Sequence, residues 1–390
     1  MKFRQEIRKS RVIQILSSLR VTVACIVLLF ILTLWGTIAQ VHMGLYQAQE
    51  RYFYSHFFLA LGFLPFPGAH LVMWVMFVNI IGALLVKFSF QWKNIGLLVI
   101  HLGILLFLIS GFVTFKTSVD SHLTLKEGQA SNTSAAFYQW EIAIWENSRE
   151  SQDLKTTRNV TAIDIKDLKL EHDFVVDHLN FKIKLTKYLK NSAAYRTGGS
   201  GQDGFLNASN IQKLEPLSLE NEPEKNTPGV LIQILTENEE VQNILLYGGE
   251  QEATKFKVGE KQYNIILRFK RYRMPFLIKL VDFTMEKHPG TDTARSFKSL
   301  VAVESNGVWR EKLISMNNPL RYKDYTFYQA SYSIDKNGKE ISTLAVVRNA
   351  GRILPYTATF ITVVGLMMHF LMSAFRRKAN KNKVQKNVSS

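Results

Sequence analysis

Long apolar runs occur near both ends of the sequence, and the middle lacks them. No window between Lys116 and Arg352 approaches the length of a membrane span. A helix needs about 20 apolar residues to cross about 30 Å of hydrocarbon. The pattern therefore predicts three membrane-spanning helices before a large polar domain and one after it, in runs at 21–40, 71–86, 95–115 and 354–375.

The first apolar run follows a basic segment, as the hydrophobic part of a secretory signal peptide does. The run at 21–40 is too long for that part, and no clear small-residue cleavage site precedes the next runs. We therefore expect the first run to be retained as a membrane span.

The middle of the chain alternates apolar and polar residues, as half-buried strands do. Turn-forming clusters at 198–201 and 288–290 separate such segments, and the polar stretch Asn191–Ser209 predicts a long mobile loop. Closely spaced strands with turn signals favour a sandwich or a barrel-like domain. The alternation is clearest in Trp140–Trp145, Phe181–Leu185, Val230–Ile234 and Tyr263–Arg268.

The predicted fold class is an integral membrane protein with α-helical spans, three N-terminal and one C-terminal, and a large mainly-β extracytoplasmic domain. The expected organisation is a cytoplasmic basic segment (1–20), three transmembrane helices (21–115) with an outer loop (41–69), the β domain (116–352), a fourth transmembrane helix (353–375) and a cytoplasmic basic tail (376–390).

The net charge of +16 comes partly from basic clusters that flank the apolar runs. A strongly basic chain is also compatible with nucleic-acid binding, but nothing in it resembles a nucleic-acid module. Lysine and arginine in short loops favour the cytoplasmic side of a membrane. Four spans place both termini and the loop Lys87–Lys93 on that side, so we expect the β domain on the outer side of the cytoplasmic membrane. The terminal clusters comprise Lys2, Arg4, Arg8, Lys9 and Arg11, and Arg376, Arg377, Lys378, Lys381 and Lys383.

The predicted outer loop is rich in aromatic residues and ends in Leu64-Pro-Phe-Pro-Gly68. Aromatic side chains favour the headgroup zone of a bilayer, and two prolines prevent a helix from continuing. An interfacial helix or turn is therefore expected between the first two spans.

The sequence lacks the motifs of most enzyme sites. No HExxH, GxSxG or phosphate-binding glycine loop occurs. The single cysteine, Cys25, lies in the first apolar run, which excludes an internal disulfide or a CxxC site. His172 and His178 flank acidic residues that could bind a metal weakly, but a solvated strand or turn explains their spacing better. A hydrolase or a kinase has no support.

His101 stands among aliphatic residues, about 10 Å past the cytoplasmic end of the third run. An imidazole there has no water to bond, so it must face another helix, a cavity or a ligand. A structural hydrogen bond, for example with Asn79 of the second run, and a ligand role both remain open on these residues alone. Gly103 and Gly111 offer smooth faces to a helix or a flat ligand. His369 is expected to extend toward the headgroups.

Several motifs, in their order along the chain, resemble the ResB (also called CcsB) family. The resemblance spans nearly the whole chain. It begins with Leu16-Ser-Ser-Leu-Arg-Val-Thr at the first run, and the other segments that carry it are Leu64–Gly68, Trp92–Gly103, Asp282–Thr291 ahead of a strand with Ser299, and Tyr322–Tyr332.

The resemblance implies the haem-binding subunit of a membrane cytochrome c synthase of System II. Such a synthase carries haem b across the membrane and attaches it to CxxCH motifs of apocytochrome c outside. By position, His101 matches the family's haem-ligating histidine, and a ResC (CcsA)-type partner supplies the second axial histidine. Neutral imidazole is a good ligand for haem iron. The tryptophan-rich segment of that partner is absent here, so we expect a separate partner and a non-catalytic role for this chain.

Two other classes of function remain open. One is a membrane-anchored receptor or scaffold with an extracytoplasmic β domain, although the predicted cytoplasmic segments are short and contain no output module. The other is a transporter or channel subunit, which would need more polar residues in its spans than Asn79, His101 and His369.

Overall fold

The computed structural model describes residues 10–147, 159–176, 178–196, 204–236, 240–291, 294–335 and 338–388. The chain divides into a helical unit, Met1–Val119 with Arg348–Ser390, and a β domain, Asp120–Val347. Some predicted features lie outside the described residues: Lys2, Arg4, Arg8 and Lys9, the turn at 198–201, and the side chains of Arg377, Lys378, Lys381 and Lys383.

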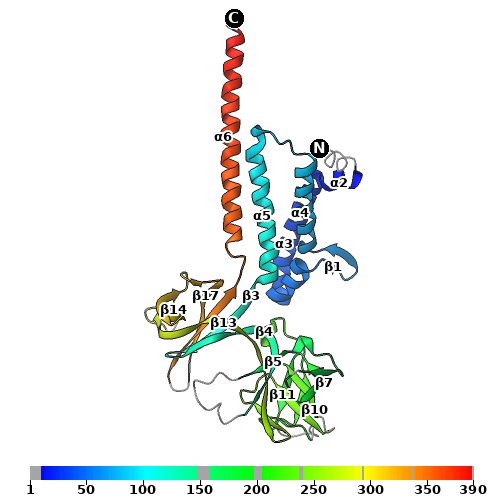
Figure 1. Cartoon of the computed structure of the whole chain (residues 1–390), viewed down its shortest axis with the longest axis vertical. Coiled ribbons are helices and arrows are strands. Elements are labelled where there is room, and N and C mark those ends of the chain that lie inside the picture. Colours follow the sequence, from blue (N-terminus) through cyan, green and yellow to red (C-terminus); the bar gives the residue numbers. More distant parts are fainter. Residues whose placement is uncertain are drawn as a thin grey trace. The chain divides into compact units, whose positions relative to one another are not determined.

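The helical unit confirms the predicted three-plus-one arrangement of spans (Figure 1). Four stretches are long and apolar enough to cross a membrane: Leu19–Tyr54, Ala69–Val86, Trp92–Thr117 and Leu354–Arg376. The helices are α2 (Arg11–Leu16), α3 (Leu19–Ala48), the π-helix η1 (Gln49–Tyr54), α4 (Ala69–Val86), the 3-10 turn η2 (Trp92–Asn94), α5 (Ile95–Thr117) and α6 (Leu354–Val388).

The first apolar helix extends beyond the run that predicted it. Its apolar part is followed by a break at Gly44, whose φ of 79° falls in the region that glycine adopts without strain. A hairpin of β1 (Phe57–Ala60) and β2 (Leu64–Pro67) then precedes α4. Its prolines lie on a two-stranded ribbon, where a missing backbone donor is tolerated. Trp35 of α3 packs against Tyr52, Phe58 and Phe66 at ring-centroid distances of 5.7–5.9 Å, so this segment folds back onto the helix.

Helices α5 and α6 lie side by side (Figure 1) and approach through glycines. A methyl group at Gly96 would lie 2.5 Å from the backbone nitrogen of His369, and one at Gly365 would lie 2.7 Å from that of Ile100. One at Gly103 would collide with the Thr362 hydroxyl. Small residues let two backbones come this close in a membrane, where packing rather than hydrophobicity holds helices together.

The β domain contains every segment that was predicted from clear alternation, in β4, β7, β10 and β13. The prediction of a continuous loop over Asn191–Ser209 is wrong, because Ser192–Tyr195 form β8 and pair with β9. The strands are β3 (Val119–Lys126), β4 (Ala130–Glu146), β5 (Thr161–Asp164), β6 (Asp173–Val175), β7 (Phe181–Leu189), β8 (Ser192–Tyr195), β9 (Lys213–Pro216), β10 (Gly229–Thr236), β11 (Val241–Tyr247), β12 (Thr254–Val258), β13 (Lys261–Lys287), β14 (Ala294–Ser305), β15 (Val308–Ser315), β16 (Leu320–Tyr322), β17 (Tyr325–Ile334) and β18 (Glu340–Arg348), with short 3-10 turns η4 (Ile165–Asp167) and η5 (Pro223–Lys225).

Two apolar cores lie along the long strands β4 and β13. In the first, the sheet β11-β10-β7-β6 packs on one half of these strands, as in a sandwich. Its centre is fully buried and consists of aliphatic residues such as Ile142, Ile183, Ile232 and Ile265. Strand alternation thus places one apolar face of each sheet against the other.

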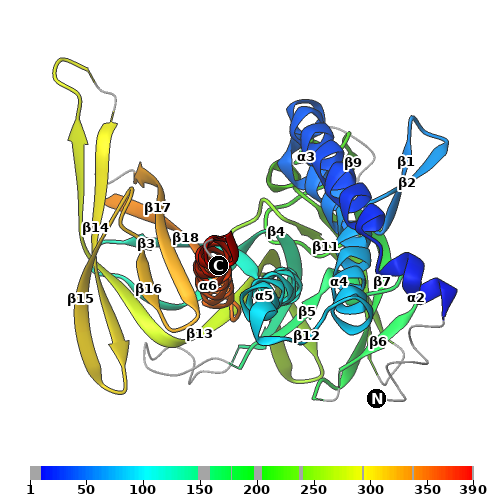
Figure 2. The same ribbon diagram turned by 90° about the horizontal axis from the view of Figure 1, so that it is seen from above.

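The second core lies inside a curled sheet (Figure 2). The strand order β15-β14-β13-β4-β3-β18-β17-β16 brings the two end strands, β15 and β16, near each other. Leu280, Val301, Phe327 and Leu344 fill the interior. Asn306 and Gly307 connect β14 to β15 with φ of 55° and 79°, the two positive values that a tight hairpin turn requires.

Candidate functional site

The imidazole of His101 is fixed by its own helix. Its Nδ1 lies 2.7 Å from the carbonyl oxygen of Leu97, one turn earlier on α5. A carbonyl only accepts hydrogen bonds, so Nδ1 must carry the proton, and the Nε2 lone pair is left available. This is the arrangement of metal-binding histidines, whose second nitrogen commonly donates to a backbone carbonyl. His101 as a whole is half-buried.

His101 belongs to an apolar stripe along α5. At about 100° per residue, Leu108 and Phe112 lie within about 20° of it around the helix, whereas Gly96 and Gly103 lie roughly opposite. Phe112 stacks on Trp74 of α4, with 4.2 Å between ring centroids. The surface that α6 covers and the surface that carries the imidazole are therefore different.

The structure does not pair His101 with Asn79. The Asn79 side chain accepts a hydrogen bond from Thr22 at 2.7 Å and donates to the backbone carbonyls of Leu16 and Ser18. It therefore joins α4 to the start of α3, as a buried amide that stabilises helix packing does. The hydrogen bond of His101 stays within α5.

Gly103 and Gly111 have different neighbours. The face at Gly103 is occupied by α6, through Thr362 and Ala358, so it accommodates a helix rather than a flat ligand. Gly111 faces only the terminal methyl of Met73. His369 lies on α6, where its backbone contacts Gly96, and its ring lies 6.0 Å from that of Phe370.

A histidine pair at the other end of the stripe escaped the sequence analysis. The rings of His56 and His70 lie 4.6 Å apart, centroid to centroid, and His70 also contacts Phe115 at 4.9 Å. The Nδ1 of His70 is buried without a hydrogen-bond partner among the described residues. The pair forms because the β1–β2 hairpin folds back, with Gly68 donating to the carbonyl of His56 at 2.8 Å. The sequence shows only two separate histidines.

Two segments that carried the resemblance meet inside the curled sheet. Ser299 on β14 donates to the side-chain oxygen of Gln329 on β17 at 2.7 Å. Ser342 on β18 lies 2.9 Å from the Ser299 hydroxyl and accepts from the amide of Gln329 at 3.2 Å. With Ser342 donating to Ser299, the three side chains form a closed ring in which every donor has an acceptor. Buried polar groups satisfied in this way are structural rather than reactive.

A basic groove of about 760 Å³ lies along β13 and β4. Glu141 is buried and pairs with Arg268 at 2.8 Å, while Arg271 and Arg273 line the same groove. Burial, and then the charge of Arg268, lower the pKa of Arg271. The alternation in β4 places a polar residue at Glu141, but its ionic partner is not evident from sequence because Arg268 is far along the chain.

The remaining histidines of the β domain do not assemble a metal site. Within the described ranges no three histidine, cysteine, aspartate or glutamate side chains come together. His172 bonds the carbonyl of Leu170 at 2.9 Å, and His178 lines the basic groove. Their neighbour Asp177 lies outside the described residues. Burial lowers the pKa of His122, whose Nδ1 is buried and has no hydrogen-bond partner in the described parts of the chain.

Comparison with known proteins gives two matches. The sequence profile of the ResB-like family matches residues 230–341, which include β10 to β17. Protein NrfI of Wolinella succinogenes is 29% identical to this chain over 119 residues, or 30% of the chain. That stretch is 13% of the length of NrfI, so the chain matches only a small part of this relative.

Proposed function

Because this chain belongs to the ResB-like family, we propose that it is the haem-binding subunit of a membrane complex that assembles c-type cytochromes. Membership of the family supports a role in cytochrome c biogenesis. The proposed task is to bind haem b within the membrane and to help present it outside, for attachment to CxxCH segments of apocytochromes.

The orientation of His101 is the observation that carries the proposal. The bond from Nδ1 to Leu97 fixes the tautomer and aims the Nε2 lone pair away from α5. Neutral imidazole is a suitable axial ligand for haem iron and adds no charge to the membrane. A histidine with a purely structural role would use its second nitrogen on a neighbouring helix, and no such bond occurs among the described residues.

The surroundings of His101 suit a porphyrin. One turn before and after it on α5 lie Leu97, Leu98, Ile104 and Leu105, which form an apolar wall. No second histidine lies beside it in the described structure, so this chain provides one axial position. We assign the other to a ResC (CcsA)-type partner, in keeping with the family resemblance.

The chain itself is proposed to bind and position rather than to catalyse. Thioether bonds form between haem vinyl groups and thiols of the apocytochrome. The one cysteine of this chain, Cys25, is buried in α3 and offers no thiol for that step. With the β domain on the outer side of the membrane, its proposed task is to receive the apocytochrome or to shield haem.

The decisive experiment compares variants of the complex purified with its partner, using the haem absorption spectrum. His101→Ala should lose most of the bound haem and of c-type cytochrome assembly, while the protein still inserts, because the span becomes more apolar. Added imidazole should restore part of both. His101→Gln keeps hydrogen-bonding capacity but not the ligand nitrogen, so it should also fail.

His369→Ala serves as the matched control. It removes the other histidine of α5 and α6, and the complex should still bind haem. Normal haem content in His101→Ala would exclude the ligand role. Normal assembly in His101→Gln would show that a hydrogen bond suffices. Synthase activity of this chain without a partner would exclude the two-subunit proposal.

A further inference from the structure

The strand β15 forms one end of the curled sheet and has a free edge. It pairs with β14 in a register without a bulge. The backbone N–H and C=O of Ser315 point away from β14, because they form hydrogen bonds with the backbone of Asn318, at 3.2 and 3.1 Å respectively. Backbone groups of an antiparallel strand alternate between its two sides, so every second residue points the same way. Within the described residues, no backbone group pairs on that side with Trp309, Glu311 or Leu313.

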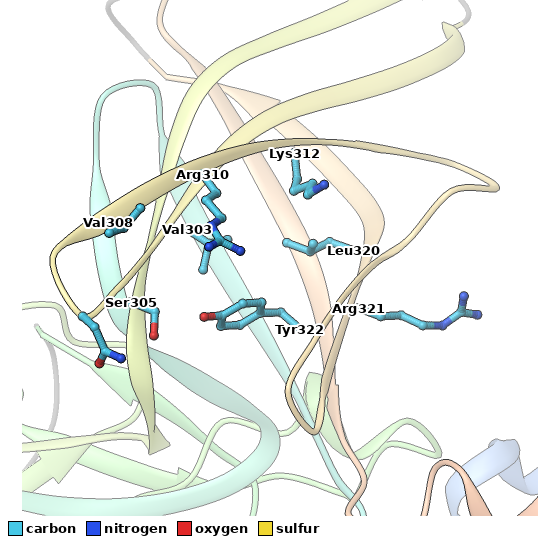
Figure 3. Close-up of a pocket in the computed structure, with 9 residues that line it drawn as sticks. Val303, Ser305, Val308, Arg310, Lys312, Leu320, Arg321 and Tyr322 are labelled. Carbon is cyan, nitrogen blue, oxygen red and sulfur yellow. The ribbon is translucent and has the colours of Figure 1, made fainter.

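A cavity of about 360 Å³ lies next to this edge, between β15 and β16 (Figure 3). Val303 and Leu320 give it apolar walls. Figure 3 shows the guanidinium of Arg310 turned toward the ring of Tyr322, while the side chain of Arg321 runs away from them. The edge therefore has room for side chains of an added strand.

The basic side chains on the cavity side of this edge have no ionic partners within the described residues. Arg310 and Lys312 point to the cavity side of β15, and Arg321 lies on β16. None of the three forms an ion pair in the described parts of the chain. On the opposite face of β15, Trp309 and Leu313 are 46% and 49% exposed, so the strand offers apolar surface beside its charges.

Charged side chains on an edge strand commonly prevent aggregation, and that explanation must be separated from binding. A second copy of β15, added antiparallel, would set arginine and lysine against each other, and like charges opposite one another are destabilising. An incoming strand with acidic side chains at alternate positions would meet these same charges favourably. The charges thus disfavour a second copy of β15 and favour an acidic strand.

We propose that β15 accepts an extended, acidic segment of another polypeptide as an added antiparallel strand. Main-chain bonds to Trp309, Glu311 and Leu313 hold the segment, and alternate acidic side chains face Arg310 and Lys312. Strand addition in general takes its affinity from backbone bonds and its specificity from side-chain pockets. The proposal goes beyond haem binding and does not depend on His101.

The test uses the full chain in detergent micelles and a fluorescent seven-residue peptide in which glutamate alternates with valine. Fluorescence anisotropy should report saturable binding. A peptide with lysine in place of glutamate should bind at least about tenfold more weakly, because cross-strand charge pairs change sign.

Methylation of peptide nitrogens separates strand addition from simple charge attraction. Glutamates opposite Arg310 and Lys312 point their N–H groups away from β15, whereas the valines donate to it. Methylation of the valine nitrogens should therefore abolish binding, and methylation of the glutamate nitrogens should leave it intact. Equal binding of the two methylated peptides would overturn the proposal.

Charge reversal gives the protein-side test. Arg310→Glu with Lys312→Glu should lose the glutamate peptide and bind the lysine peptide instead, a result that an unfolded variant does not produce. Lys255→Glu with Lys257→Glu makes the same charge change on β12, where both lysines are exposed, and should alter nothing. No binding by the unmodified chain, or self-association of the unmodified chain in place of peptide binding, would refute the proposal, the latter in favour of a second copy.

Discussion

The hydroxyl of Ser299 donates to the side-chain oxygen of Gln329 at 2.7 Å, and this bond joins two strands that are not neighbours in their sheet. Strands β14 and β17 lie near opposite ends of the strand order, so the bond crosses the interior of the curl. Both residues are in segments that carried the family resemblance. The similarity there thus includes a contact that holds the curled sheet closed.

Removal of that hydroxyl should destabilise the β domain. Ser299→Ala removes a bond from the half-buried side-chain oxygen of Gln329 and one from the buried hydroxyl of Ser342, which costs about 1–3 kcal/mol. Thermal unfolding of the purified full chain, followed by far-UV circular dichroism, measures the loss. Ser333→Ala, at an exposed position of β17, is the control and should change little. Equal melting temperatures of the two variants would contradict a structural role for the hydrogen-bonded ring of Ser299, Gln329 and Ser342.

The glycines between α5 and α6 should tolerate no side chain. Gly103→Val would collide with Thr362 and should cost about 1–3 kcal/mol by overpacking. Gly111→Ala on the same helix should be silent, since its methyl would meet only the flexible end of Met73 at 3.1 Å. Thermal aggregation of the detergent-solubilised protein distinguishes them, and an unchanged midpoint for Gly103→Val would show that the helices can separate freely.

Acid should weaken the β domain through Asp164. Burial pulls the pKa of Asp164 upward, but the hydrogen bond and charge of Lys270, 2.7 Å away, together with the backbone hydrogen bond and charge of Lys166, outweigh it and lower that pKa below the ordinary 3.8. The stabilisation is present above pH 3.8 and is lost as the pH falls through the lowered value. Asp164→Asn should cost about 2 kcal/mol at neutral pH and should flatten this acid dependence.

A matched pair provides the control for that titration. Asp173 and Lys182 lie 3.7 Å apart and are both about half exposed, so Asp173→Asn should cost less than about 1 kcal/mol. Urea unfolding at several pH values compares the two variants. If Asp164→Asn lost stability in acid as steeply as the unmodified chain does, another group would be responsible for the acid dependence.

The basic loops predict which side of the membrane each segment occupies, and reporter fusions can test this prediction. Fusions after Lys93 and after Lys378 should be active only with a cytoplasmic reporter. A fusion at Asn207, in the β domain, should be active only with an external one. An external reporter active after Lys378 would require an odd number of spans and would remove the four-span arrangement.

The apolar helices and parts of four strands, β4, β7, β10 and β13, follow from local patterns, but the contacts between distant segments do not. The alternation of Trp140–Trp145 predicts β4, yet the pairing of Glu141 with Arg268 depends on a register between strands that lie far apart in the chain. The contact of His56 with His70 likewise depends on how a hairpin folds back. His101 could be singled out because a polar residue in an apolar helix is conspicuous by itself, whereas its hydrogen bond to Leu97 depends on the side-chain rotamer, which the sequence does not specify.

The close fit of α5 and α6 also has a consequence for biosynthesis. Gly103 and Thr362 are about 260 residues apart in the chain. Because ribosomes add about 5–20 residues per second, α6 is synthesised about 13 to 50 s after α5. During that interval the glycine face of α5 is open to lipid or to the insertion machinery. The helical unit can therefore be completed only after the whole β domain has been synthesised.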